Sequence, residues 1–205
     1  EQMLTVIALP LGAYQTNTYI VHAKGAKSCA IIDPGYEAKT ILSKVAALGL
    51  TVDAVLLTHG HFDHVGGVKA LAAEFPGLPV YLHPGGCKLW MSEGDWSQFP
   101  NPVTSYFYPL ANCDFTEVNF CEDGEVIQAG GLRFVTLTTP GHTHGSVCFQ
   151  CENALFTGDT LFAGSCGRTD FPGGSTKKIM KSLKRLAELA DVITPNLTEA
   201  AFLLD

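Results

Sequence analysis

The sequence predicts a single α/β domain with its chemistry at the end of one buried strand. Strand-like apolar runs alternate with segments of helical period, and a histidine-rich run joins one such strand to a helix. The chain has 205 residues, of which 46% are hydrophobic and 16% charged, enough for one globular core. No short-period repeat or linker divides it.

The first half of the chain contains strands, with helices between them. Strands are expected at 4–9, 18–22, 29–33, 53–58 and 80–82. The first helix is expected from Tyr36 to Leu48, because its apolar residues recur at helical spacing before Gly49. A second helix is expected from Val65 to Phe75, after the histidine run.

The second half begins with a segment of weak periodicity. Residues 90–112 contain both tryptophans and several prolines, and are interpreted as a loop over the site. A substrate lid and a surface insertion packed on the sheet are both open alternatives. Further strands are expected at 126–129, 132–138, 147–151 and 155–157. Ser175 then caps a helix whose apolar residues share one face.

Composition excludes several classes of partner. The net charge is -7 with no basic run, which argues against nucleic acid, and no apolar stretch reaches the roughly 20 residues of a membrane span. Neither a leader-like start nor a disulfide-dense pattern is present, so we expect a cytoplasmic protein. Cys148 and Cys151 form a lone C-x-x-C inside a strand-like run, where packing is the favoured role.

The run from Thr58 to His64 carries the strongest chemical signal. It places three imidazoles and one carboxylate within six residues, the ligand types of zinc, iron and manganese. His59 and His61, two apart on an extended segment, point the same way. Asp63 and His64 then face inward from the start of the following helix.

Two further segments complete the expected site. His142 lies in a loop punctuated by Gly and Pro, between two strand-like runs, and Asp159 follows a strand within Gly-Asp-Thr. Each signal alone is weak, because His in a loop and Gly-Asp in a turn are common. Together with the first run they supply enough ligands for two metal ions.

These ordered motifs resemble those of the metallo-β-lactamase-fold hydrolase superfamily. The matching segments are 59–64 (His-x-His-x-Asp-His), 141–142, 158–160, 16–19, 32–35 and 167–175. The last segment is similar to the single-domain glyoxalase II-like branch, the hydroxyacylglutathione hydrolase-like proteins. The resemblance covers about residues 3–190. It implies a four-layer αβ/βα sandwich with a metal site at one edge of two packed sheets.

The end of the chain departs from that pattern. We expect 1–190 to form the hydrolase domain and 191–205 an atypical C-terminal tail of the same domain. Glyoxalase II-like proteins carry a His in a Pro-Gly-His-Gly turn here, whereas Leu197 stands at this position. Residues 190–205 instead resemble a pyridoxal kinase family segment, which indicates a replaced or fused tail. A coincidental strand-turn-helix end is the alternative.

The resemblance implies a role for each candidate ligand. One metal ion is held by His59, His61 and His142, a second by Asp63 and His64, and both are bridged by Asp159. The second ion then has three protein ligands, so we expect one tightly bound ion, Zn²⁺ or else Fe or Mn, and a weaker second site. The candidates to replace the missing ligand are Asn196, Glu199 or a group of a neighbouring chain.

The reaction implied is hydrolysis of a hydroxyacyl-glutathione-like thioester through a metal-bound hydroxide, oriented by Asp63 as the catalytic residue. Asp33 either orients a ligating imidazole or only forms its turn. Arg168 either contacts the substrate or is structural, and Lys177 and Lys178 either bind glutathione carboxylates or form a solvated helix face.

Other functions stay open at this level. A persulfide dioxygenase-like enzyme with mononuclear iron would suit two His and one Asp. A lactonase or secreted β-lactamase is a further alternative, and the cysteines and the missing leader count against the secreted version. A metal-binding protein whose altered tail has abolished turnover is the non-enzymatic alternative. The fold alone does not choose among them. We expect a small-molecule thioester as partner, with neither nucleic acid nor membrane, and the oligomeric state is left open.

Overall fold

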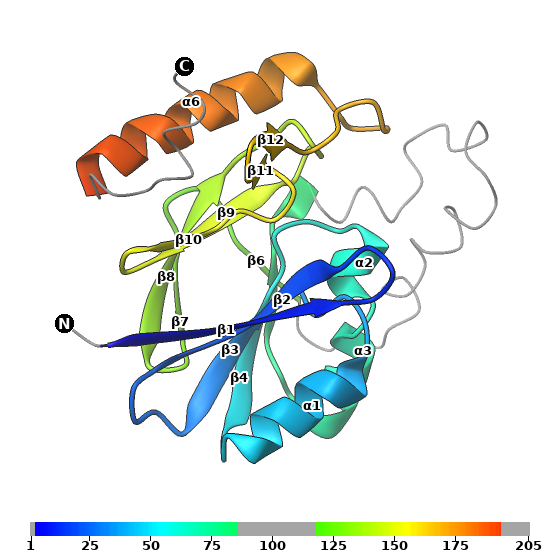
Figure 1. Cartoon of the computed structure of the whole chain (residues 1–205), viewed down its shortest axis with the longest axis vertical. Helices are drawn as coiled ribbons and strands as arrows, with labels where there is room; N and C mark the ends of the chain where they lie inside the picture. The colour runs from blue at the N-terminus through cyan, green and yellow to red at the C-terminus, as the bar shows by residue number, and fades with distance from the viewer. Residues whose placement is uncertain (1–2, 86–117, 194–205) are drawn as a thin grey trace.

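Two β-sheets packed face to face form the centre of the structure, a computed structural model that describes residues 3–85 and 118–193 (Figure 1). The first sheet has the order β1-β2-β3-β4-β5-β6. Its strands are β1 (Leu4–Leu11), β2 (Thr16–Ala23), β3 (Ser28–Ile32), β4 (Thr51–Leu56), β5 (Val80–Leu82) and β6 (Val118–Phe120). The first three are antiparallel, and β3 to β6 run parallel.

The second sheet is antiparallel, with the order β10-β9-β8-β7. Its strands are β7 (Val126–Ala129), β8 (Leu132–Thr138), β9 (Val147–Cys151) and β10 (Ala154–Phe156). A small hairpin of β11 (Leu161–Phe162) and β12 (Ser165–Cys166) follows. The helices are α1 (Ala38–Ala47), α2 (Phe62–Val65), α3 (Val68–Glu74) and α6 (Thr176–Ile193). None of the helices in the described ranges combines the length and apolar character that crossing a membrane requires.

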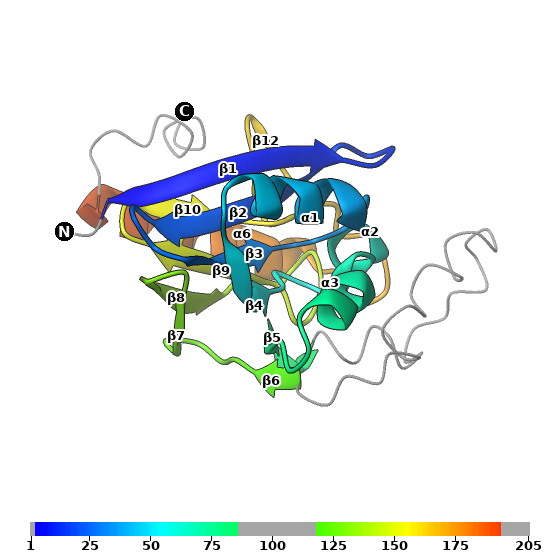
Figure 2. The same cartoon turned by 90° about the horizontal axis from the view of Figure 1, so that it is seen from below.

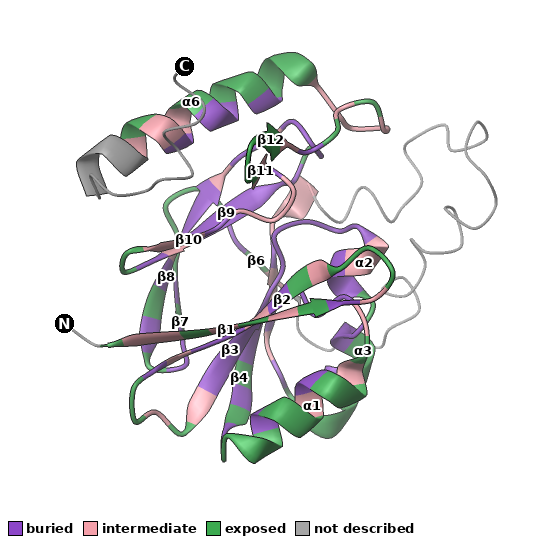
Figure 3. Ribbon diagram, viewed as in Figure 1, coloured by how far each residue is buried: buried purple, intermediate pink, exposed green. Residues whose placement is uncertain are grey.

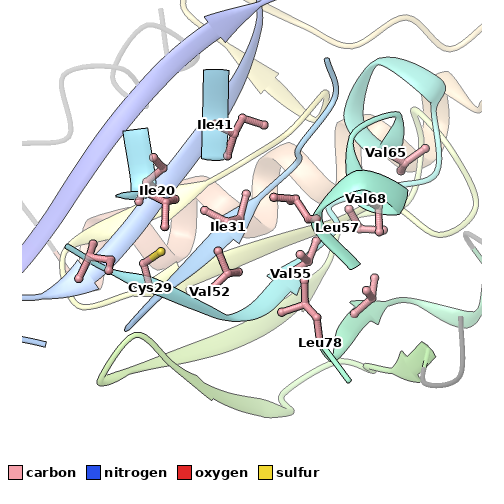
Figure 4. Close-up of a cluster of buried hydrophobic side chains, with 14 of the residues drawn as sticks. Ile20, Cys29, Ile31, Ile41, Val52, Val55, Leu57, Val65, Val68 and Leu78 are labelled. Carbon is pink, nitrogen blue, oxygen red and sulfur yellow. The ribbon is translucent and has the colours of Figure 1, made fainter. Parts of the chain in front are cut away.

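Three apolar layers hold these elements together. In the first layer, Ile41 of α1 and Val68 of α3 pack on Ile31 of the first sheet (Figure 4). The second lies between the sheets, where Phe134 and Phe149 of the second sheet are fully buried. The third lies between the second sheet and α6, which covers its outer face (Figure 2). The molecule is therefore a four-layer αβ/βα sandwich, which confirms the fold expected from the resemblance.

Burial follows this layering. β3 is buried at every position after Ser28, and β4 from Ala54 to Leu56, because helices cover one face and the second sheet covers the other (Figure 3). By contrast, β7 alternates between exposed and buried residues. The parallel pair β3–β4 is connected through α1, the connection that parallel neighbours need.

Most expected elements agree with the structure, but one helix was predicted wrongly. The segment 65–75 was expected as a single helix, whereas α2 and α3 are separated by Gly66 and Gly67. A Cβ at Gly66 would lie 2.4 Å from the carbonyl oxygen of Gly35, and one at Gly67 would lie 2.8 Å from that of Pro34. The chain breaks here because it packs directly against the turn after β3.

Three short strands were not anticipated. They are β6, β11 and β12, each of two or three residues, too short for a periodic signal. The expected loop at 90–112 lies outside the described residues. Helix α6 continues to Ile193, so the first residues of the expected tail are helical, and the remainder of that tail lies outside the described residues.

Helix α6 is fastened to the second sheet by one bidentate ion pair. Arg185 donates to both carboxylate oxygens of Asp123, at 2.7 and 2.9 Å, and to the carbonyl oxygen of Thr138 at 3.0 Å. Asp123 also accepts the backbone N–H and the hydroxyl of Thr138. These hydrogen bonds, those of Arg185 foremost, lower the pKa of Asp123.

We expect Asp123→Asn to destabilise the fold by about 1 kcal/mol at pH 7, a discounted value because 38% of Arg185 and 47% of Asp123 are exposed to screening solvent. The pKa of Asp123 is lower in the folded protein than in the unfolded chain, where it is about 3.9, so its ionised form stabilises the fold above that pH. This stabilisation is lost as the pH falls through the folded pKa. The difference between wild type and variant should therefore shrink below about pH 4 in urea unfolding at several pH values.

Glu188→Gln is the matched control, since it removes a carboxylate from the same helix. Glu188 faces Lys184 at 3.9 Å with both side chains largely exposed, so no measurable change is expected. Equal effects of the two variants, or a difference independent of pH, would contradict this role of Asp123.

Candidate metal centre

The predicted ligands come from loops at the ends of strands in both sheets. The run 58–64 follows β4 and enters α2, which carries Asp63 and His64, so its histidines follow the carboxyl end of a parallel strand. His142 lies between β8 and β9, and Asp159 between β10 and β11. The sheets meet at Thr58, whose carbonyl accepts the N–H of Val147 at 2.8 Å. Residues up to 100 positions apart in sequence therefore converge on one place.

Three imidazoles form the first group of this centre. His61 Nδ1 lies 3.0 Å from His59 Nε2 and 2.9 Å from His142 Nε2. A tetrahedral ion with metal–nitrogen bonds of about 2.0–2.1 Å holds its nitrogen ligands roughly 3.3 Å apart. An oxygen of Asp159 completes a set of four donor atoms within 4.8 Å of one another. The spacing fits a small divalent cation.

Hydrogen bonds fix which nitrogen of two rings carries the proton. His142 Nδ1 donates to the carbonyl oxygen of Arg168 at 2.7 Å, because a carbonyl can only accept. The Thr58 hydroxyl donates to Asp33 at 2.6 Å, so it accepts from His59 Nδ1 at 3.0 Å. The Nε2 lone pairs of His59 and His142 therefore both face the centre, as ligation requires.

Burial keeps these imidazoles neutral. The pKa values of His59, His61 and His142 all lie below the usual range, chiefly because burial penalises the charged ring. Neighbouring imidazoles lower these pKa values further, whereas the charge of Asp159 opposes the shift at His61 and His142. Metal ligation requires the neutral form of histidine. The electrostatics of this group thus agree with its geometry.

The second group combines His64 with two carboxylates. His64 Nε2 lies 3.1 Å from Asp159 and 3.5 Å from Asp63, and this buried atom forms no well-aligned hydrogen bond with any described residue. A ring nitrogen that faces two carboxylates needs a proton or a cation between them. Although burial lowers the pKa of His64, the charges of Asp159 and Asp33 raise it well above the usual value.

The same interaction acts on the carboxylate. Burial alone would raise the pKa of Asp159, but His64, followed by His142 and His61, brings it down to about 2. Asp159 therefore stays ionised between the two groups, and its oxygens lie 3.1 Å from His64 and 3.3 Å from His142. An ionised carboxylate between two sets of imidazoles suits a bridge between two cations.

Asp33 underlies both groups. One of its oxygens accepts the N–H of Thr58 at 2.8 Å, and the other accepts His64 Nδ1 at 2.8 Å as well as the Thr58 hydroxyl. Its backbone is left-handed, with φ of 49°, and its carbonyl accepts the hydroxyl of Thr18. Asp33 thus forms its turn and also holds the ring of His64.

Two threonines of the site were not assigned a role from sequence. The Thr16 hydroxyl donates to Asp63 at 2.9 Å from the start of β2, and Thr58 connects Asp33 to His59. Thr58 directly precedes the first His, which is a usable signal. Thr16 opens the Thr-Asn-Thr-Tyr segment, but only the tertiary fold brings it to Asp63.

Arg168 differs from the other predicted residues, because its charge is engaged elsewhere. The guanidinium donates to both oxygens of Asp170, at 2.7 and 2.6 Å, and lies 3.7 Å from the ring centroid of Phe171. Only its carbonyl contributes to the centre, through His142. Lys177 and Lys178 are exposed on the first turn of α6.

The cysteines of the C-x-x-C do not join either group. Both are buried with free thiols, and Cys148 lies 3.4 Å from the hydroxyl of Thr139. Burial raises the pKa of Cys148 to about 12 and that of Cys151 to about 11. These thiols are core residues, in agreement with the favoured role.

Comparison with known proteins agrees with this geometry. The chain is 37% identical over 189 residues to a hydroxyacylglutathione hydrolase of Aeromonas salmonicida, covering 92% of this chain and 62% of that protein. It is 33% identical over 197 residues to the hydroxyacylglutathione hydrolase GloC of Haemophilus influenzae, covering 93% and 88%. The chain thus spans less than two thirds of the first relative and most of the second.

Solved structures share the architecture. The BLEG-1 B3 metallo-β-lactamase superposes with a TM-score of 0.75 at 32% identity, over 90% of this chain and 87% of that one. TTHA1623, solved in a di-iron-bound form, gives 0.73 at 36% identity with the same coverage. ETHE1 from Myxococcus xanthus gives 0.70 at 27% identity, over 90% and 71%.

A family profile gives the widest assignment. The metallo-β-lactamase superfamily profile matches residues 11–193, which include every residue of both groups. On the strength of this match, and of a sandwich that brings imidazoles and carboxylates together at its edge, the chain belongs to the metallo-β-lactamase superfamily.

Proposed function

We propose that the protein is a metal-dependent thioesterase that hydrolyses hydroxyacyl-glutathione-like thioesters. The observation that carries this proposal is the convergence of three buried, neutral imidazoles with an ionised carboxylate. The similarity to proteins named hydroxyacylglutathione hydrolase supports the substrate class. The test is hydrolysis of S-lactoylglutathione by protein loaded with zinc, iron or manganese; no turnover with any of them would overturn the proposal.

The proposed ligands divide between two ions. His59, His61 and His142 would hold the first, Asp63 and His64 would hold the second, and Asp159 would contact both. Among the described residues the second ion would have three protein ligands, Asp159 included, so its binding would be weaker. Asp33 accepts a hydrogen bond from His64 Nδ1, and Thr58, which donates to Asp33, accepts one from His59 Nδ1. Both residues therefore fix the orientation of the imidazoles.

A bound divalent cation would polarise the thioester carbonyl and lower the pKa of water toward about 7. The chain's own residues then direct the attack. Thr16 donates to Oδ2 of Asp63, which leaves Oδ1 to accept a hydrogen bond from the attacking water. The water oxygen bonds to the acyl carbon, the carbon–sulfur bond breaks, and the thiolate takes up the proton, so that the products are an acid and a thiol.

A persulfide dioxygenase-like iron enzyme is the second candidate. Histidine with carboxylate also suits non-haem iron, and one structural neighbour was solved with two irons. Oxygen consumption with glutathione persulfide by iron-loaded protein, without thioester hydrolysis, would favour this candidate.

The two ions should respond differently to loss of a ligand. We expect wild type to retain about one equivalent of zinc after desalting and to take up a second only with excess metal. His142→Ala should lose the tightly held ion, whereas His64→Ala should keep it, as measured by plasma emission analysis.

His22→Ala is the matched control, since His22 is half-buried on β2 and, among the described residues, its ring has one hydrogen bond, to the adjacent carbonyl of Ala23. It should bind as wild type does. Two tightly held equivalents in wild type would show that the second site is not weak.

Asp33→Asn tests the support of the centre. In one orientation the new amide nitrogen would face the N–H of Thr58, and in the other it would face the hydroxyl of Thr58 and Nδ1 of His64. In either orientation at least one donor loses its acceptor. We expect about 10- to 100-fold weaker binding of the second ion by chelator competition. The fold should also lose about 2 kcal/mol in urea unfolding.

Asp53→Asn is the control for a general loss of stability. Asp53 accepts the N–H of Gly130 and the hydroxyl of Ser28, and it contacts no candidate ligand. It should destabilise the protein without weakening metal binding. If both variants bind metal as wild type does, Asp33 does not support the centre.

Thr16→Val removes the hydroxyl that donates to Asp63. A hydrogen bond to a charged group contributes about 1.5–3 kcal/mol, so kcat/KM should fall roughly tenfold or more. Metal content should not change, and Thr16→Ser should restore activity. Thr51→Val, at an exposed position at the start of β4, should have no effect. Loss of metal in Thr16→Val would mean that the hydroxyl supports ion binding rather than the attack.

A further inference from the structure

A cavity of about 680 Å³ opens on one side of the metal centre. The side chains at its base include Asp63, His64 and Asp159, the residues of the second group, whereas His59, His61 and His142 do not line it. Ligand pockets in proteins measure about 300–1,000 Å³, so the volume suits a small molecule. The cavity therefore leads to the second group from one direction.

Part of the wall of this cavity, away from the metal centre, is apolar. Leu155 and Leu161, from β10 and β11, line it together with Leu183, Leu186 and Ala187 of α6, and Leu155 packs against the apolar cluster that contains Leu186. At the rim, Tyr14 and Phe162 are 69% and 41% exposed. Exposed aromatic residues beside an apolar pocket are typical of a site that buries an apolar ligand.

Charge restricts the ligand further. No Lys or Arg is among the described residues that line the cavity, and its charged side chains are carboxylates and His64 at the base. The polar side chains of Gln15, Thr16 and Asn17 are neutral. An anionic group such as a glutathione carboxylate would find no cation along these walls, whereas a hydrocarbon chain would lose only its contact with water.

We propose that this cavity binds the hydrocarbon part of the acyl group, so that the enzyme prefers thioesters of medium-length apolar acids. The acyl carbonyl lies at Asp63 and Asp159, its chain extends between the β10–β11 segment and α6, and the thiol part stays outside the cavity. This rests on the proposed thioester hydrolysis. Water adds to the acyl carbon, and the fatty acid and the free thiol leave.

The first test is a series of acyl N-acetylcysteamine thioesters, from acetyl to octanoyl, with zinc-loaded protein. This thiol is small and uncharged, so only the acyl chain varies. Each methylene buried should raise kcat/KM about threefold to fourfold until the cavity is full. A flat or falling series would overturn the proposal.

A variant on α6 locates the effect. Ala187→Phe places a ring inside the cavity and should reduce the preference for hexanoyl over acetyl at least tenfold. Met180→Phe adds a ring to the same helix at a residue that is 58% exposed and does not line the cavity, so it should keep the wild-type preference. Equal loss of preference in both variants would show that the chain binds elsewhere.

Binding without turnover separates this proposal from the proposed function. Octanoate should bind zinc-loaded protein at least tenfold more tightly than acetate by calorimetry, and Ala187→Phe should abolish the difference. If octanoate binds at least tenfold more tightly than acetate but no thioester is hydrolysed, the cavity assignment stands and the thioesterase proposal fails. If thioesters are hydrolysed without chain-length dependence and octanoate binds no better than acetate, only the cavity assignment fails.

Discussion

The buried carboxylate of Asp33 is the interaction on which the rest of the site depends. A buried charge is costly unless its hydrogen-bonding capacity is filled, and this one accepts the N–H and hydroxyl of Thr58 together with His64 Nδ1. These donors belong to the end of β4 and to α2, while Asp33 itself follows β3. The centre therefore forms only when three segments are in place, and its ligand orientation is coupled to the folding of the first sheet.

Packing of the two sheets completes the centre. The first sheet supplies the run 58–64, and the loops of the second supply His142 and Asp159. Thr58 lies where they meet: its carbonyl accepts the N–H of Val147, and a Cβ at Gly158 would lie 2.3 Å from its hydroxyl oxygen. The close contact allows the carboxylate of Asp159 to approach the imidazoles. Ligand positions are therefore set by sheet-to-sheet packing as much as by the histidine motif.

Much of this could be read from the sequence, and the exceptions have physical reasons. The strands β5, β7, β8 and β9 have the expected bounds, because their apolar runs end at clear turn signals. The break between α2 and α3 was missed because it depends on contact with a distant turn. For Thr16, the role depends on a hydrogen bond across 47 residues, and for Arg168 the charge is engaged by Asp170, two residues along the chain. Local sequence patterns indicate the chemistry of the side chains and the periodicity of the secondary structure, but they do not indicate which distant atoms become neighbours in the fold.

The buried cysteines have a consequence for an enzyme that would release thiols. Thiol–disulfide exchange proceeds through the thiolate, and thiols with pKa values of about 12 at Cys148 and about 11 at Cys151 remain almost wholly protonated at neutral pH. Cys29 and Cys121 are held in the same state, each with a pKa of about 12. Burial of these four cysteines thus disfavours mixed disulfides between them and small thiols, including the thiols that the proposed reaction would release.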